Sequence, residues 1–433
     1  MSAPTSTAKG RGLSGAVDQV FSSLSNGLIL FAIAVVSTPE DFGVLSLLLM
    51  LLTAAVGCMR GALGTPLLLN AARGTEQIRR EGSYAVTAAL AVSPILVGAM
   101  WLLLEGRELG NPSIVIVAIA TPVVMVQDVL RYVVISEGRP HIAAIWDGFW
   151  FLGSVALLVS TWGGVRFVDV DVLIAGWSVL ASVALLGLAV DLHLLPRFRG
   201  FFRWLAAGWQ HRLRYGADAG LEQGGLFLAL ALVTGLVGAV ATAALRGAMA
   251  LLAPVGILTS ALPLVVIPES ARRSATRKQV WRGLTKITVI ASVITLMAGL
   301  AFYLLPESIG KLLLGDTFPL TQQIILIVTL QYVIGLWGAS QRVHLATFNR
   351  SAAMLTLKVT YVILGVGFFV GGGVLFNSAT GAAVGIAIAA TLTTTVSLAW
   401  LTPWGDEEVG RHRLKKHADS TAMWTLDPSP TRR

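Results

Sequence analysis

The chain has 433 residues, of which 55% are hydrophobic and 13% are charged. Soluble domains carry about 25% charged residues, so this composition excludes a soluble protein and indicates one that crosses a membrane many times. The formal net charge of +9 could indicate a nucleic-acid partner. The distribution of the basic residues along the chain therefore matters more than their sum.

Apolar segments of about 20 residues, each long enough to cross a hydrocarbon core of about 30 Å as a helix, recur along the whole chain. We therefore predict an all-α polytopic membrane protein with about twelve transmembrane helices. Their expected positions are 14–36, 42–63, 83–104, 113–135, 142–163, 171–192, 214–236, 240–266, 286–305, 321–340, 352–375 and 380–401. Pro254 and Pro263 make the eighth segment the best candidate for a kink.

The first of these segments is unusually polar, because it contains DQVFSSLSNG at 18–27. Asp18, Ser22 and Asn26 follow one another at helical spacing and share one face of the predicted helix. Residues 1–12, which precede it, are expected to be a disordered cytoplasmic N-terminus.

Basic residues gather in alternate loops, which predicts the topology. If the N-terminus is cytoplasmic, the inner segments hold most of the arginines and lysines, whereas the outer loops hold only Arg107, Arg166 and Lys311. By the positive-inside rule both termini are cytoplasmic, and we expect a multi-pass protein of the bacterial cytoplasmic membrane. The positive charge thus favours anionic membrane lipid as a partner and excludes nucleic acid.

An internal repeat divides the chain into two halves. At an offset of about 200 residues, Asp18 falls on Asp218 and Ser22 on Glu222 within DAGLEQGG, where Gln223 follows. Because both halves begin on the same side, the repeat is parallel, with a pseudo-twofold axis along the membrane normal. We expect an N-terminal lobe at 13–193, an amphipathic basic cytoplasmic linker at 194–213, a C-terminal lobe at 214–402 and a cytoplasmic tail at 403–433.

Charged residues inside the predicted helices are the candidates for a functional site. A charge near the bilayer centre costs about 2.5 to 3.5 kcal/mol, so these side chains are expected to face a polar interior between the lobes. They are Asp18, Arg60, Asp128, Arg131, Asp147, Asp218, Glu222 and Arg246.

Each candidate has a structural alternative. Arg60 and Arg131 could extend to the inner interface, and Asp18 could cap its helix or pair with a neighbouring arginine. Asp128 and Arg131 lie three residues apart and could neutralise each other. Asp147 is expected at the interface, whereas Arg246 lies deeper in its segment.

Several catalytic signatures are absent from the sequence. It has no GxxxxGK[ST] loop and no HExxH pair, and Cys58 is its single cysteine. No sizeable loop outside the membrane offers carboxylates, so we predict a protein that is not an enzyme and holds neither a metal nor another cofactor. A proton or a sodium ion remains a candidate for coupling.

Three stretches resemble a known family. GAVDQVFSSLSNGLILFAIAVVSTPEDFGVLSLLL, QDVLRYVVISEGRPHIAA and LRGAMALLAPVGILTSALPLVVIPESAR are similar to segments of bacterial polysaccharide flippases of the O-antigen type. These belong to the multidrug/oligosaccharidyl-lipid/polysaccharide (MOP) exporter superfamily. The resemblance, over residues 12–400, implies a V-shaped pair of six-helix lobes with a central cavity. It further implies alternating access that carries a polyprenyl-(pyro)phosphate-linked oligosaccharide to the outer leaflet.

The resemblance also implies roles for the candidates. The anionic headgroup would bind Arg60, Arg131, Arg246 and Arg342, since arginine suits bidentate phosphate contacts. Coupling or gating would fall to Asp18, Asp128, Asp218 and Glu222, and Ser22, Asn26 and Gln223 would be polar residues of the cavity. On this hypothesis Arg131→Glu abolishes transport and leaves the protein folded.

Two other functions stay open. A multidrug cation exporter of the same superfamily would use the carboxylates to bind an organic cation, although arginines in the cleft oppose this. A non-transporting scaffold in glycan assembly would tolerate neutralisation of the intramembrane charges. A glycan polymerase or glycosyltransferases are candidate partners of the flippase.

Overall fold

The computed structural model describes residues 21, 24–69, 74–103, 112–163, 168–272, 275–348 and 351–400, and every element within them is a helix. The first half comprises helix Leu24–Val36, α2 (Pro39–Met59), the π-helical turn η1 (Arg60–Gly64), α3 (Thr65–Leu69), α4 (Thr75–Leu103), α5 (Pro112–Ser136), α6 (Pro140–Trp162) and α7 (Val170–Leu192).

The second half follows after a short connection. It comprises α8 (Phe201–Ala207), α9 (Trp209–Leu236), α10 (Ala239–Leu251), α11 (Ala253–Arg272), α12 (Arg277–Leu304), α13 (Glu307–Leu314), the 3-10 turn η3 (Gly315–Thr317), α14 (Phe318–Thr347), α15 (Ser351–Phe376) and α16 (Ala379–Trp400).

The predicted all-α membrane fold is confirmed. Within the described residues, ten helices are long and apolar enough to cross a membrane, or up to eleven if a bent pair counts as one span. A shorter apolar helix, Leu24–Val36, covers the described part of the first predicted segment. Asp18 and Ser22, like the two predicted tails, lie outside the described residues.

The eighth predicted segment is bent, as its prolines suggested. It consists of α10 and the first part of α11, which meet at Leu252 with an angle of 56°. Proline at 254 lies just inside α11, where its missing N–H and fixed φ favour a new helix start over a continuous helix.

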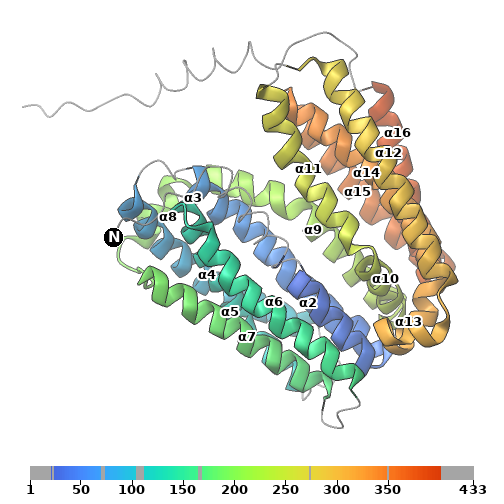
Figure 1. Ribbon diagram of the computed structural model, residues 1–433, viewed down its shortest axis with the longest axis horizontal. Helices are drawn as coiled ribbons and strands as arrows, with labels where there is room; N and C mark the ends of the chain where they lie inside the picture. The colour runs from blue at the N-terminus through green and yellow to red at the C-terminus, as the bar shows by residue number, and fades with distance from the viewer. Residues whose placement is uncertain are drawn as a thin grey trace, which may run out of the picture.

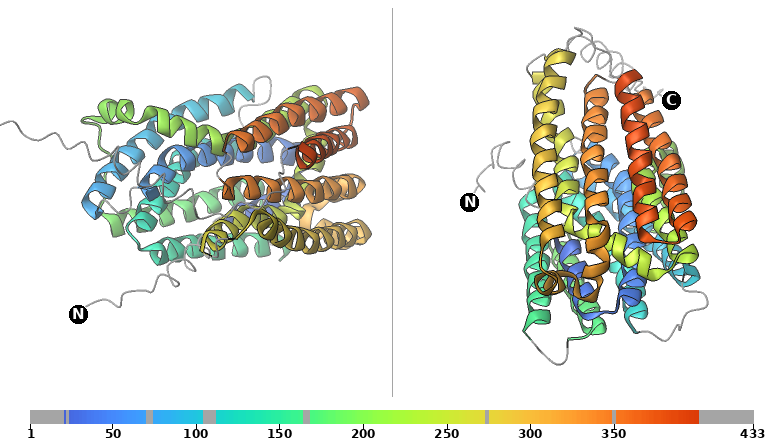
Figure 2. Two further views of the ribbon diagram at one scale, coloured as in Figure 1. Left: turned by 90° about the horizontal axis from the view of Figure 1, so that it is seen from above. Right: turned by 90° about the vertical axis from the view of Figure 1, so that its right-hand side faces the viewer.

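The helices form two bundles that meet at one end and diverge at the other (Figure 1). We call them the N-lobe (24–192) and the C-lobe (209–400). In the C-lobe, α12, α14 and α16 stand side by side, and α15 packs on α16 (Figure 2). The lobes diverge toward the end that carries α3 and α8, which the sequence predicts to be cytoplasmic. The domain limits at 13–193 and 214–402 remain predictions, since they extend beyond the described residues.

Close contacts between the lobes seal the opposite end, which is predicted to be the outer one. Gly43 of α2 lies so near α10 that an added Cβ would be 2.1 Å from the carbonyl oxygen of Ala239, so only glycine fits there. The indole N–H of Trp162 donates to the carbonyl oxygen of Leu312 in α13 at 2.6 Å. Close backbone contacts and an exposed hydrogen bond therefore hold the outer end together.

Helix α9 contacts both lobes. Its first turns press against η1, where a Cβ on Gly61 would be 2.2 Å from the carbonyl oxygen of Tyr215. Farther along, Gly225 lies against Val362 of α15. Helix α9, which we count with the C-lobe, thus packs with its first turns on η1 and also along α15 (Figure 1).

The contact between α15 and α16 yields a test of the fold. We expect Gly372→Ala to lower the thermal midpoint of the purified protein, because its Cβ would be 2.2 Å from the carbonyl oxygen of Gly381. Overpacking of this kind costs about 1 to 3 kcal/mol. The neighbouring Gly371 has nothing within 4 Å of an added Cβ, so Gly371→Ala is the matched control and should leave the midpoint unchanged or raise it. Equal midpoints for the two variants would contradict the packing of these helices.

Candidate functional site

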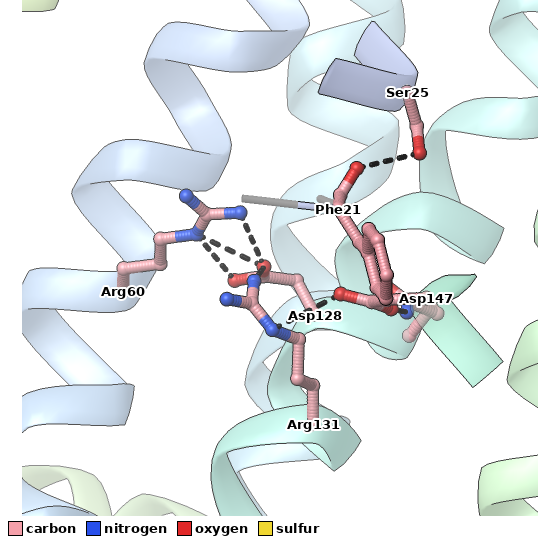
Figure 3. Close-up of polar contacts among 7 residues, drawn as sticks. Phe21, Ser25, Arg60, Asp128, Arg131 and Asp147 are labelled. Carbon is pink, nitrogen blue, oxygen red and sulfur yellow. Dashed lines mark hydrogen bonds and ion pairs between the residues drawn. The ribbon is translucent and has the colours of Figure 1, made fainter. Parts of the chain in front are cut away.

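The N-lobe contains a buried network of charges built by η1, α5 and α6 (Figure 3). Arg60 donates to Asp128 through Nε at 2.9 Å and Nη2 at 2.7 Å. Arg131 donates through Nη1 to the same carboxylate at 3.1 Å, and its Nε lies 3.3 Å from Oδ2 of Asp147. Gln127 completes the set by donating to Oδ1 of Asp147 at 2.8 Å. Two arginines and two aspartates thus cancel in charge.

The central side chains of this network are buried inside the N-lobe. The side chains of Arg131 and Asp147 are only 2% and 1% exposed, so neither extends to a membrane interface. The expectation that Asp147 is interfacial is therefore wrong, because its pairing with Arg131 makes burial tolerable. Mutual neutralisation of Asp128 and Arg131, the structural alternative, is observed. Arg60 is more open, and it begins a π-helical turn of a kind that is frequent at functional sites.

The C-lobe, in contrast, contains a cavity. A cavity of about 530 Å³ lies among α9, α14, α15, α16 and the bent pair of α10 and α11. Asp218, Glu222, Arg342 and Lys358 are its charged lining residues. Amide and hydroxyl groups share the wall, among them those of Gln223, Gln331, Gln341, Tyr332, Tyr361 and Thr394.

Both acidic residues of this cavity have a basic partner. Lys358 donates from Nζ to the backbone carbonyl oxygen of Asp218 and lies 3.3 Å from its Oδ1. Arg342 reaches Glu222 only loosely, with Nη2 3.9 Å from Oε1. Asp218 and Glu222 stand one turn apart on α9 and are 47% and 49% exposed. The four charges cancel, and the looser pair is the easier one to exchange for a ligand.

Arg246 differs from these residues, because no carboxylate of the described part of the chain pairs with it. It lies on α10 at the contact between the lobes, where Nη1 is 3.7 Å from the sulfur of Met50 in α2. Its Nε is buried and has no hydrogen-bond partner among the described residues. Tyr332, which lines the C-lobe cavity, is close enough to interact with it electrostatically. Within the described residues, this guanidinium therefore lacks an anion that would compensate its desolvation.

Of the remaining predicted site residues, one lines the C-lobe cavity and one does not. Gln223 lines the C-lobe cavity, whereas Asn26 is half-buried on helix Leu24–Val36 and is not among the lining residues. Asp18 and Ser22 lie outside the described residues. Lys358 was missed, although a lysine inside an apolar segment is a signal that could have identified it.

These side chains suit the binding of a polar, anionic molecule better than they suit catalysis. Among the described residues no group of three or more His, Cys, Asp or Glu side chains could hold a metal ion. Arg246 and the loosely paired Arg342 offer guanidinium groups, and the cavity wall offers neutral hydrogen-bonding groups of both kinds.

Comparisons with known structures identify the fold. An inward-facing multidrug resistance transporter of the MATE family and the MOP superfamily matches with a TM-score of 0.65 and 14% identity, over 94% of this chain and 96% of the other. The lipid II flippase MurJ in an inward closed conformation matches with a TM-score of 0.66 and 11% identity, over 97% and 93%. A MOP transporter from Pyrococcus furiosus, described as having a binding pocket of reverse polarity, matches with a TM-score of 0.56 and 16% identity, over 90% and 93%.

These similarities establish the two-lobe architecture of MOP transporters for this chain. All three neighbours are transporters or a flippase, and none is an enzyme. No protein-family model and no curated protein matches the sequence. An outward-facing MATE transporter matches with a TM-score of 0.57, below the 0.65 of the inward-facing one, in line with lobes that meet at the predicted outer end.

Variants of Arg131 and Arg246 can show which of these two arginines the fold requires for its stability. We expect Arg131→Gln to destabilise the protein by about 3 to 5 kcal/mol, because it leaves Asp147 without its buried cation and Asp128 with Arg60 alone. Arg246→Gln should be neutral or stabilising, because it removes a charge that no described carboxylate compensates. Thermal unfolding of the two purified variants measures the difference, and a larger loss for Arg246→Gln would overturn the assignment.

The buried position of Arg131 also changes the expected outcome of Arg131→Glu. A third carboxylate would lie beside Asp128 and Asp147 with only Arg60 to balance them, so misfolding is expected. Arg246 is therefore the better residue for a test of transport.

Proposed function

We propose that this protein is a flippase that moves a polyprenyl-(pyro)phosphate-linked oligosaccharide from the inner to the outer leaflet of the bacterial cytoplasmic membrane, for cell-envelope polysaccharide biosynthesis. The fold supports transport by alternating access between two lobes, and MurJ, a lipid II flippase, is among the neighbours. The glycan itself and a partner glycosyltransferase or polymerase are parts of the proposal that the sequence suggests.

The observation that carries this proposal is Arg246. A buried guanidinium at the contact between the lobes is costly unless an anion accompanies it, and the described part of the chain supplies no carboxylate. A phosphate or pyrophosphate on the substrate meets that need and can form bidentate hydrogen bonds with arginine.

The C-lobe cavity suits the remainder of the polar headgroup. Sugars present many hydroxyl groups, which require both donors and acceptors, and the glutamine, threonine and tyrosine side chains of the wall supply both. Arg342 holds Glu222 at 3.9 Å, so an incoming anion could replace that carboxylate without breaking a short hydrogen bond. Asp218 and Glu222 remain candidates for coupling, each with its resident cation.

Alternating access then follows from the contacts between the lobes. The headgroup enters from the end at which the lobes diverge, and neutralisation of Arg246 lowers the cost of separating α10 from α2. Opening the outer end requires release of the contact between Gly43 and Ala239 and of the bond from Trp162. The mobile unit is therefore a whole lobe.

A multidrug cation exporter is the second candidate, because MATE transporters are among the structural neighbours. An organic cation needs an available carboxylate, yet Lys358 and Arg342 already neutralise Asp218 and Glu222. The charge balance of the cavity therefore favours the flippase.

Transport in cells tests the main proposal. In a strain that lacks the protein, one lipid-linked oligosaccharide should accumulate, as measured by mass spectrometry of polyprenyl-phosphate-linked glycans. We expect wild-type protein to clear it, Arg246→Lys to clear it in part and Arg246→Gln to fail, because an amide has no charge to offer a phosphate.

The matched control for this experiment is Arg282→Gln, which removes an exposed arginine near the start of α12. It should restore transport as the wild type does, provided that expression levels are equal. Full complementation by Arg246→Gln, or an unchanged lipid-linked pool in the deletion strain, would refute the flippase.

Binding of a cationic probe separates the two candidates. We expect the wild type not to bind tetraphenylphosphonium in equilibrium dialysis and Lys358→Met to gain binding, because Asp218 then lacks its cation. Lys358→Met combined with Asp218→Asn is the control and should bind none. Binding of the probe by the wild type, lost in Asp218→Asn, would instead favour the exporter.

A further inference from the structure

The connection between the lobes, residues 193–208 with α8, is attached to α4 of the N-lobe by hydrogen bonds of its backbone. The N–H of Arg197 donates to Oγ1 of Thr87 on α4 at 2.9 Å, and the hydroxyl of Tyr84 donates to the carbonyl oxygen of Arg199 at 3.2 Å. The ring of Trp204 on α8 stacks on Tyr84 with centroids 5.4 Å apart. The connection is therefore a structured part of the N-lobe.

An apolar slot lies between this connection and α4. It has a volume of about 290 Å³ and is lined by Thr87, Leu90, Ala91, Phe198, Phe201 and Phe202. Phe201 is buried, whereas Phe202 is 81% exposed, as is suited to a surface that hydrocarbon covers. The α4 residues of the slot follow the predicted start of the membrane segment at 83 by four to eight positions, which corresponds to a depth of about 6 to 12 Å.

Three arginines alternate in the sequence with the phenylalanines of this slot. The guanidinium of Arg197 lies 5.6 Å from the ring centre of Tyr84, one turn before Thr87 on α4. Arg199 and Arg203, which flank Phe201 in the sequence, are exposed and form no ion pair with a described residue. A cation near Tyr84 and an apolar slot that begins one helical turn farther along α4 match the arrangement of a phospholipid headgroup and its acyl chain.

We propose that this slot, with Arg197, Arg199 and Arg203, binds one anionic phospholipid, which places its phosphate on the arginines and an acyl chain between Phe198, Phe202 and Leu90. The apolar slot and the nearby arginines together indicate which kind of molecule binds here. A nucleic acid has nothing to place in a phenylalanine-lined slot at this depth. A zwitterionic lipid carries a cation beside its phosphate, so it brings no net negative charge to the three arginines. The depth equals that at which amphipathic helices bury their apolar faces, about 5 to 10 Å.

Bound lipid has a mechanical consequence. It adds a bridge between α4 and α8, and α8 leads through Gly208 directly into α9, the helix that contacts both lobes. The lipid thus stabilises the fixed end of the segment through which the lobes are connected. The site is independent of the proposed substrate and exists whether or not the protein is a flippase.

Native mass spectrometry of the full-length protein in detergent tests this site. The probes are phosphatidylglycerol and phosphatidylcholine with the same two acyl chains. We expect the wild type to retain one phosphatidylglycerol in preference to phosphatidylcholine. Arg199→Gln combined with Arg203→Gln should lower that affinity about tenfold or more, since each arginine contributes to binding of anionic lipid.

Two further variants make the test specific. Ala91→Trp fills the slot from its exposed rim and should remove the bound lipid while all arginines remain. Arg282→Gln combined with Lys286→Gln removes two exposed charges from α12 and should retain the lipid. Equal retention of both lipids by the wild type, or equal loss in the α12 control, would refute a built site.

A competition experiment separates the two sources of an anionic lipid. Undecaprenyl phosphate added in equal amount should fail to displace the retained phosphatidylglycerol. Displacement of the phosphatidylglycerol from the wild type would overturn the proposal, because the slot would then be a site for a polyprenyl carrier. Since this readout needs no transport, its outcome is distinguishable from that of the glycan-accumulation experiment.

Discussion

The cost of an uncompensated charge inside the membrane constrains most of this structure. In the N-lobe, Arg60 and Arg131 are balanced by Asp128 and Asp147, with distances between 2.7 and 3.3 Å. In the C-lobe, Lys358 and Arg342 face the two carboxylates of α9. Once these pairs are formed, Arg246 remains as a cation that the described chain does not compensate, and its function must be sought in an anion from elsewhere.

Close backbone contacts are the second constraint, because they determine which parts can move. Glycines let α2 approach α9 and α10 to a distance that no side chain tolerates, and α15 and α16 meet in the same way. Contacts of this kind have short range, so two surfaces either fit or separate. A change of access therefore involves whole lobes, with α9 as the element that must adjust to both.

Sequence analysis could predict the fold because its signals are local. Hydropathy located the helices, and Pro254 indicated the bend in the eighth segment, since both effects depend only on neighbouring residues. Charge pairing could not be predicted in full, because the partner of a charge lies on another helix. The contact of Arg131 with Asp147 on α6 and that of Lys358 with Asp218 on α9 are of this kind. The assignment of Arg131 to the headgroup remains a prediction.

The two halves of the repeat have diverged in a way that bears on function. In the N-lobe the charges of α5 and α6 meet directly, and Gln127 donates a further hydrogen bond to Asp147. In the C-lobe the corresponding interior is open, its ion pairs are longer, and its carboxylates are half-exposed. A buried network of short ion pairs keeps its geometry, whereas an open, loosely paired cavity can exchange partners at low cost. The N-lobe is thus suited to be the rigid lobe, and the C-lobe, with Arg246 at its edge, is suited to receive the polar part of a substrate.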